Sequence, residues 1–204
     1  MLKNIKNSFL RIGTISLLVI GGSILLLVLS VYLGAWGKLP SKKELSDFKY
    51  QRASEVYSAD SVLIGKYFLF DRQPITFEQV PKNLIEALVA IEDERFYDHS
   101  GIDYKSLVRV ALKSILMQDT SAGGGSTISQ QLAKNLYPRE KSGKFHLAIS
   151  KFKEMIIASR LEAMYSKEEI LMLYLNTVSF GDNTFGIESA ALKFFNKKAK
   201  HLLL

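Results

Sequence analysis

The sequence of 204 residues contains no cysteine. Disulfide bonds and metal sites built from thiolates are therefore excluded, and a domain outside the cytoplasm has to be held together by packing alone. Internal repeats and low-complexity tracts are also absent. After subtraction of a membrane segment, the length leaves room for one globular domain of ordinary size.

A second absence is that of charge between Ile12 and Gly37, a segment rich in Leu, Ile and Val. About 20 apolar residues span a bilayer core, and the apolar part of a signal peptide is only about 7–15 residues long. We therefore predict a transmembrane helix over 12–37. Tyr32 and Trp36 lie near its outer end, where aromatic rings anchor at the membrane interface.

The charges that flank this segment leave its orientation open. Three basic residues lie on each side, namely Lys3, Lys6 and Arg11 before it and Lys38, Lys42 and Lys43 after it. Overall, 27 basic residues outnumber 20 acidic ones, which gives a net charge of +7. Such a surface favours anionic partners such as phospholipid headgroups, pyrophosphates or nucleic acid, and charge alone does not choose among them.

The rest of the chain is expected to be mainly α-helical. Ser41 and Glu44 have the spacing of a capping box and predict a short helix next to the membrane. Residues 55–70 resemble a β-hairpin. Everything after residue 80 is predicted to be helical, with helices over about 81–96, 103–117, 128–136, 145–165 and 167–175.

An acidic segment at the end of the first of these helices is a candidate catalytic site. Leu84, Leu88 and Glu92 lie four residues apart, so Glu92 is expected on the buried face and Glu94 in solvent. Burial raises the pKa of a carboxyl group toward the range that is useful for proton transfer. The alternatives are a solvated helix end or a metal site made by Asp93, Asp98 and His99.

A glycine-rich loop that opens onto a capped helix is a second candidate. Gly123, Gly124 and Gly125 precede Thr127, which forms a capping box with Gln130. Glycines allow backbone amides to approach a ligand closely, and a helix N-terminus attracts anions. The loop could cradle a pyrophosphate, with Lys134 adding a positive charge, or it could be a merely permissive loop. It lacks the Gly-Lys-Ser/Thr of a nucleotide-binding P-loop.

A third candidate is Glu154 on the long predicted helix. Glu154 shares one face with Ile157, Ala158 and Leu161, so its carboxylate is expected to point toward the core. The ordinary alternative is an intrahelical ion pair with Lys151 or Lys153.

Together these segments closely resemble the family 51 glycosyltransferases, which occur as monofunctional transglycosylases and as the first domain of class A penicillin-binding proteins. Five motifs carry the resemblance in order: residues 92–101 (EDERFYDHSG), 125–135 (GSTISQQLAKN), 151–154 (KFKE), 167–176 (KEEILMLYLN) and 186–191 (GIESAA). Residues 54–65 also resemble the linker of the bifunctional class.

The resemblance implies a lysozyme-like fold and an inverting transfer on lipid II. The 4-hydroxyl of an acceptor sugar attacks the donor sugar and displaces undecaprenyl pyrophosphate, so that glycan strands grow. Glu92 matches the catalytic base and Glu154 the second essential carboxylate. By analogy with inverting hydrolases we expect these two carboxylates to lie roughly 6.5–9.5 Å apart.

Further residues match the substrate-binding positions of the family, namely Asp93, Phe96, His99, Ser126, Thr127, Gln130, Gln131, Lys134 and Lys151. Arg139 is the nearest candidate for an additional basic residue, although the stretch from Pro138 to Lys144 departs from the family pattern. No cofactor is required, and a divalent cation such as Mg²⁺ or Mn²⁺ could assist departure of the pyrophosphate.

The expected organisation is a cytoplasmic tail over 1–11, the membrane helix over 12–37, a juxtamembrane helix and hairpin over 38–75, and a glycosyltransferase domain over 76–204. Members of the family continue past the stretch that matches Phe194–Lys198, so we expect the domain to be truncated. The catalytic part is expected on the extracytoplasmic side of the bacterial inner membrane. Its partners are lipid II, the growing glycan strand, membrane lipids and proteins of the cell-wall synthesis complex, with no nucleic acid.

The rival interpretation is a lysozyme-like lytic enzyme that cleaves glycan strands with the same pair of carboxylates. Such an enzyme would need neither a basic anion cradle nor a membrane anchor. A non-catalytic membrane scaffold would have little reason to retain both Glu92 and Glu154.

Overall fold

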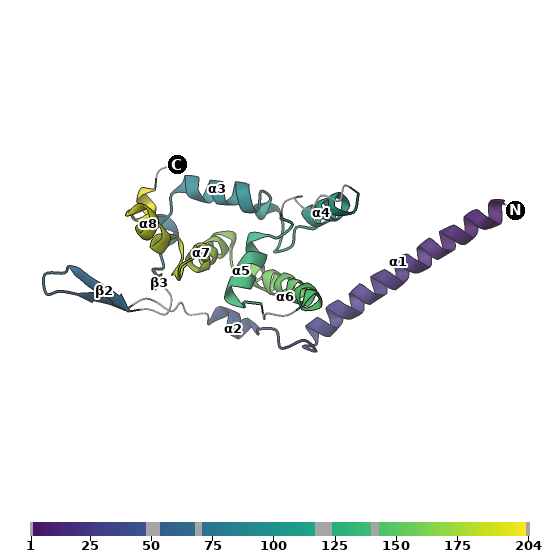
Figure 1. The fold of residues 1–204 in the computed structure, drawn as a ribbon, viewed down its shortest axis with the longest axis horizontal. Coiled ribbons are helices and arrows are strands. Elements are labelled where there is room, and N and C mark those ends of the chain that lie inside the picture. Colours follow the sequence, from purple (N-terminus) through teal and green to yellow (C-terminus); the bar gives the residue numbers. More distant parts are fainter. Residues whose placement is uncertain (1, 48–53, 68–70, 117–123, 140–142, 203–204) are drawn as a thin grey trace. The chain divides into compact units, whose positions relative to one another are not determined.

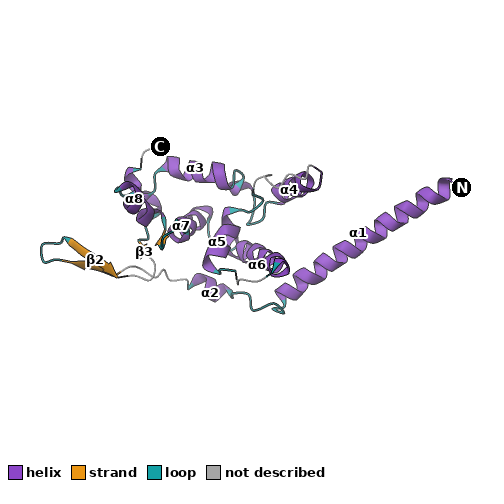
Figure 2. Cartoon of the chain, viewed as in Figure 1, coloured by secondary structure: helices purple, strands orange, loops and turns teal. Residues whose placement is uncertain are grey.

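The computed structural model describes residues 2–47, 54–67, 71–116, 124–139 and 143–202. Helices make up most of these residues, and the extended structure is limited to one hairpin and two short strands (Figure 2). The predicted mainly α class with a small hairpin before the domain is thus confirmed, and it agrees with a lysozyme-like fold. The chain divides into two compact units, Met1–Leu39 with Ser142–Lys153, and Pro40–Lys141 with Glu154–Leu204.

The first unit contains helix α1 (Leu2–Tyr32), drawn in purple in Figure 1. Its segment Arg11–Tyr32 is long and apolar enough to cross a membrane, and its side chains are mostly exposed, with Val31 buried near the end of the helix. The helix ends at Tyr32 rather than at the predicted residue 37, because Gly34 and Gly37 adopt positive φ angles that a helix cannot contain. It also includes nearly all of the predicted cytoplasmic tail.

An aromatic cluster lies just beyond the end of α1. The indole Nε1 of Trp36 donates to Ser30 Oγ at 2.9 Å, and the Trp36 ring meets Phe145 edge-on at 5.4 Å. Lys153 donates from Nζ to the Trp36 carbonyl oxygen. Phe145 and Lys153 lie on α6 (Lys144–Glu162), so these contacts join the end of α1 to the first half of that helix.

The second unit begins with a short helix and the hairpin. Helix α2 (Lys42–Ser46) has the predicted capping box between Ser41 and Glu44. Strands β1 (Ser54–Tyr57) and β2 (Leu63–Tyr67) pair antiparallel. A further strand, β3 (Asp71–Arg72), pairs in parallel with β4 (Thr184–Phe185), so the expectation that everything after residue 80 is helical is wrong at β4.

The remaining elements include the five predicted helices in their expected order, together with α8 and three 3-10 turns. They are α3 (Lys82–Glu92), α4 (Tyr104–Leu116), α5 (Ile128–Leu136), the second half of α6, α7 (Lys167–Thr177) and α8 (Ile187–Phe195), with 3-10 turns at Phe77–Gln79, Phe96–Asp98 and Ala199–His201. Ser166 and Glu169 form a capping box at the start of α7. Helices α5 and α7 pack against each other and supply much of the buried apolar core. Core side chains from α5, α6 and α7 include Ile128, Leu132, Ala158, Leu161, Ile170 and Leu171.

Helix α3 differs from its prediction in both length and orientation. It ends at Glu92, before the predicted residue 96, and the chain then forms the turn Phe96–Asp98. Ile85 is its buried residue, whereas Ile91 is 80% exposed. The buried face is therefore rotated away from the expected stripe of Leu84, Leu88 and Ile91, and Glu92 lies outside it. On α4, Val108 and Leu112 are likewise exposed.

Gly101 lets the loop after the Phe96–Asp98 turn pass directly against α6. Its φ angle is +89°, and a Cβ atom added there would lie 2.8 Å from the carbonyl carbon of Ala158. The Gly101 carbonyl oxygen accepts hydrogen bonds from Thr127 Oγ1 at 2.7 Å and from Gln130 Nε2 at 3.2 Å. This close approach therefore ties the loop to both α5 and α6.

Replacement of Gly101 by alanine should lower the free energy of unfolding by about 3 kcal/mol, because the methyl group adds backbone strain and a clash with Ala158. Urea unfolding of the detergent-solubilised chain measures this loss. Gly65→Ala is a suitable control, since nothing lies within 4 Å of a Cβ atom at that position. Equal unfolding midpoints for the two variants would contradict the proposed packing.

Candidate functional site

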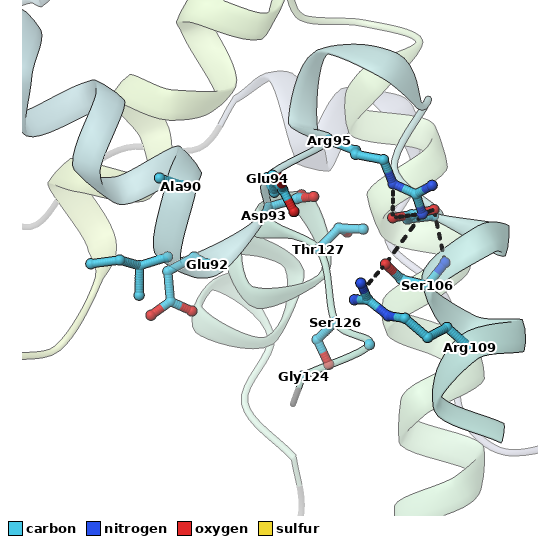
Figure 3. A pocket seen from close by; sticks show the side chains of 13 residues that line it. Ala90, Glu92, Asp93, Glu94, Arg95, Ser106, Arg109, Gly124, Ser126 and Thr127 are labelled. Atoms are coloured by element: carbon cyan, nitrogen blue, oxygen red, sulfur yellow. Dashed lines mark hydrogen bonds and ion pairs between the residues drawn. The ribbon is translucent and has the colours of Figure 1, made fainter. Parts of the chain in front are cut away.

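A pocket of about 190 Å³ lies at the end of α3, against α4 and the glycine loop (Figure 3). Its lining residues come from three segments: Ala90–Arg95, Asp103 with Ser106 and Arg109, and Gly124–Thr127. Figure 3 shows Glu92 on one side and Arg109 on the other, with Gly124 and Ser126 between them. The first two predicted sites thus meet in one cavity. Gly123 lies outside the described residues.

Glu92 stands at the rim of this pocket. It is the last residue of α3, and its side chain is exposed rather than partly buried as predicted, because the buried face of α3 is centred on Ile85. Its Oε2 accepts a hydrogen bond from Gln131 Nε2 at 2.8 Å. The orientation of this carboxylate is thus set by hydrogen bonding and not by burial. Glu94 is exposed, as predicted.

Asp93, the neighbour of Glu92, is the buried carboxylate of the acidic segment. Its Oδ2 accepts the backbone N–H of Ile128 at 3.0 Å, and His99 Nε2 lies 3.1 and 3.0 Å from the two oxygens. The side chains of Asp93 and His99 are only 4% and 7% exposed. Both polar groups thus have partners within the protein, and the substrate contacts that the resemblance implies for them stay predictions.

Phe96 is also placed in the core. It is fully buried, and Lys167 Nζ lies 4.3 Å from its ring centroid. The same ammonium donates to the His99 carbonyl oxygen at 2.6 Å and to Glu162 at 2.8 Å. Lys167 therefore secures the turn that follows Glu92, and Phe96 packs inside the protein instead of lining the pocket.

The N-terminus of α5 is satisfied by the protein itself. Ile128 N–H donates to Asp93, and Gln130 N–H donates to the capping Thr127 Oγ1 at 3.2 Å. The capping prediction for Thr127 is confirmed, but Gln130 does not close a capping box, because its amide bonds to Gly101 instead. The anion at this helix end is an internal carboxylate, so a substrate anion would have to use the preceding glycine loop.

Arg109 is a basic residue of the pocket that the sequence patterns do not identify. It lies on the exposed side of α4, and its Nη2 donates to Ser106 Oγ at 3.2 Å. A guanidinium group has five N–H donors, so Arg109 retains donors for an anion. Its position opposite Glu92 depends on how α4 packs beside the glycine loop, which no local motif encodes.

Arg95 and Asp103 form an ion pair in the pocket wall. Arg95 Nε donates to Asp103 Oδ2 at 3.1 Å, and Nη2 donates to both carboxylate oxygens. Burial acts to raise the pKa of Asp103, but hydrogen bonds from Arg95 and Ser106 outweigh it and hold that pKa well below its usual range. Arg95 is thereby neutralised, so Arg109 supplies the available positive charge of this wall.

Glu154 is buried, as its helical position predicts, with 4% exposure. Arg139 donates to its Oε1 from Nε at 2.5 Å and to its Oε2 from Nη2 at 2.9 Å. The hydrogen bond to Glu154 raises the pKa of Arg139. This bidentate pair identifies Arg139 as the basic side chain that Glu154 orients.

The remaining residues that were predicted to bind substrate lie in several parts of the structure. Lys134 is exposed in the last turn of α5, roughly 9 Å along the axis from Ile128, and its part in an anion site stays a prediction. Ser126 and Thr127 line the pocket, while Gln130 is fully buried. Lys151 belongs to the first unit. Its role and the distance between Glu92 and Glu154 stay predictions.

The alternative of a metal site made by Asp93, Asp98 and His99 is not supported by their positions. Asp93 and His99 bind each other, whereas Asp98 is exposed. Across the described ranges, no three His, Asp or Glu side chains come close enough together to hold a metal ion.

The ion pair of Asp103 predicts a specific pH dependence of stability. A carboxylate whose folded-state pKa is depressed stabilises the protein above its unfolded pKa of about 3.9, and this contribution is lost as the pH falls through the folded value. Asp103→Asn should therefore lower the thermal unfolding midpoint at pH 5–7, and the deficit should shrink below about pH 4.

Scanning fluorimetry across this pH range measures the effect, with Asp47→Asn at an exposed position as the control. A deficit that is the same at every pH would show that the charge of Asp103 does not contribute.

Comparison with known proteins places this site in a family. The transglycosylase family matches residues 61–204. Penicillin-binding protein 1A of Vibrio cholerae is 39% identical over 81% of the chain, that of Escherichia coli is 36% identical over 82%, and penicillin-binding protein 1F of Bacillus subtilis is 39% identical over 74%. The chain spans about a fifth of the length of each of these relatives, namely 20%, 19% and 20%.

The match covers the pocket, both glutamates and all five motifs. The chain therefore belongs to the transglycosylase family, the family 51 peptidoglycan glycosyltransferases of the class A penicillin-binding protein type.

Proposed function

We propose that this chain polymerises lipid II into β-1,4-linked glycan strands, with release of undecaprenyl pyrophosphate. The observation that carries the proposal is the placement of Glu92 at a pocket whose opposite wall holds Arg109 and the glycine loop. A carboxylate that can accept a proton and a basic site for an anion are the two requirements of transfer from a sugar pyrophosphate.

In the proposed reaction, the 4-hydroxyl oxygen of the acceptor sugar forms a bond to C1 of the donor sugar. The bond between C1 and the pyrophosphate oxygen breaks, and the pyrophosphate leaves with that electron pair. Glu92 accepts the hydroxyl proton as general base. Its exposure keeps it accessible to a bulky sugar, and the hydrogen bond from Gln131 orients it.

The leaving group needs stabilisation of its charge rather than a proton. Arg109 and the loop Gly124–Ser126 are the pocket residues suited to this role, because a guanidinium and exposed backbone amides bind phosphate oxygens well. Lys134 and Lys151 remain candidates through the family resemblance. Dependence on Mg²⁺ or Mn²⁺ stays a prediction.

Glu154 is proposed to orient Arg139 and not to act as a general acid. The bidentate pair occupies Nε and one terminal nitrogen of Arg139, which leaves other guanidinium donors for an anionic part of the substrate. A buried carboxylate that is already paired in this way is a poor proton donor. This assignment also argues against the lytic alternative, in which the second carboxyl group would have to protonate a sugar oxygen.

We also propose that Arg11–Tyr32 anchors the chain in the bacterial inner membrane, with the pocket on the extracytoplasmic side. A lipid-linked substrate is confined to the bilayer, and an anchored enzyme therefore meets it at a high effective concentration. The proposed partners are lipid II, the growing strand, membrane lipids and proteins of the cell-wall synthesis complex.

Glu92→Gln should reduce polymer formation from lipid II by roughly 10²–10⁴-fold, because it removes the general base while nearly preserving the shape of the side chain. The assay uses the detergent-solubilised chain and gel separation of the glycan products. Glu86→Gln, an exposed change on the same helix, is the matched control and should keep full activity. No polymer from the unmodified chain, together with digestion of preformed glycan, would overturn the proposed function.

A further inference from the structure

A row of three side chains reaches from the protein core to Glu92. Tyr174 Oη on α7 donates to Gln131 Oε1 on α5 at 3.1 Å, and Gln131 Nε2 donates to Glu92 Oε2 on α3 at 2.8 Å. Tyr174 is 5% exposed, Gln131 is half-buried and Glu92 is exposed. The row therefore connects the buried core to an exposed carboxylate of the site.

The direction of these hydrogen bonds follows from the chemistry of the groups. An ionised carboxylate only accepts hydrogen bonds, so Gln131 has to present its NH₂ end to Glu92 and its oxygen to Tyr174. Tyr174 then has to donate. Burial, followed by the charge of Glu92, raises the pKa of Tyr174 to about 12, so its hydroxyl keeps the proton at neutral pH.

We infer that Tyr174 is a positioning residue, which acts through Gln131 to hold Glu92 in the orientation needed by a general base. This inference rests on the proposed function. Glu92 needs a partner that restricts its side chain, because a glutamate at the exposed end of a helix samples several rotamers and no surrounding core restricts Glu92. The bond from Gln131 engages Oε2, and Oε1 is then the oxygen directed to receive the proton of the acceptor hydroxyl.

The proposal gives Gln131 a different role from the substrate contact that the family resemblance implies. Both ends of its amide are engaged within the protein, one by Tyr174 and one by Glu92. Removal of the tyrosine hydroxyl would leave the amide able to turn over and present its oxygen to Glu92, where two acceptors would repel each other. The effect of Tyr174 on catalysis should therefore pass entirely through Gln131.

A double-mutant cycle on lipid II polymerisation by the full, detergent-solubilised chain tests this directly. Tyr174→Phe removes only the hydroxyl group and should lower kcat about tenfold with little change in KM. Gln131→Ala should lower kcat at least as much. The double variant should be no slower than Gln131→Ala, because Tyr174 has no effect once Gln131 is gone.

Tyr165→Phe is the matched control. Tyr165 also donates its hydroxyl proton within the same unit, to the Leu45 carbonyl oxygen at 3.1 Å, but the two residues are not part of the pocket lining. It should keep the kcat of the unmodified chain. Thermal unfolding of all variants shows whether a loss of kcat follows merely from a loss of folded protein.

The outcomes separate this inference from the function on which it rests. An unmodified chain that forms no polymer, or an active Glu92→Gln variant, would overturn the proposed function itself. An active chain that depends on Glu92 but tolerates Tyr174→Phe would overturn only the inference. Losses that multiply in the double variant would also overturn it, because they would show that Tyr174 acts independently of Gln131.

Discussion

Asp93 accepts a hydrogen bond from the first amide of α5 and lies against His99, with all of these groups buried. The rest of the site depends on this contact. It joins the residue that follows α3 to the first residue of α5, and Glu92 and Gln131 are the direct or near neighbours of these two residues. A carboxylate at a helix N-terminus is stabilised both by the hydrogen bond and by the helix dipole, so the contact is strong as well as buried.

The same contact changes the electrostatics of the pocket. A glycine loop before a capped helix suggests that the helix end itself binds the pyrophosphate, but Asp93 already occupies that position. A second anion beside it would be repelled. The positive charge of the pocket instead comes from Arg109, since Arg95 is neutralised by Asp103. In the proposed reaction, the anion is therefore expected at the loop and the opposite wall, away from Asp93.

Glu92 and Glu154, the two carboxylates that match the essential residues of the family, lie in opposite environments. Glu154 is buried and held by Arg139, whereas Glu92 is exposed and held through Gln131. An exposed base can be reached by a large sugar acceptor, and a buried carboxylate can fix an arginine without being protonated itself. This difference suits a transfer whose leaving group is already a stable anion.

Local rules were sufficient to predict much of the structure. The caps at Ser41 and Thr127 depend on residues three positions apart, and both caps form as predicted, although Gln130 does not complete the predicted box at Thr127. The burial of Glu154 followed from helical periodicity, because α6 is long and regular. The same periodicity wrongly placed Glu92 on a buried face, because α3 ends at Glu92 and its buried face is set by contacts made elsewhere in the chain.

The partners of the site residues could not be predicted from sequence. Arg95 with Asp103, Arg139 with Glu154, and Tyr174 with Gln131 are contacts across a loop or between helices. Such contacts depend on the packing of whole elements, which hydrophobic periodicity and capping signals do not specify. The five motifs indicated which residues matter, but not that Asp93 and His99 contact each other or that Phe96 is buried in the core.

The most direct test of this account is the thermal unfolding midpoint of Asp93→Asn. If Asp93 holds the site together, loss of its charge weakens the contacts to Ile128 and His99, and stability should fall by about 2 kcal/mol, seen as a clearly lower midpoint. An unchanged midpoint in a variant that no longer forms polymer would contradict the account, because Asp93 would then act on the substrate and not on the scaffold.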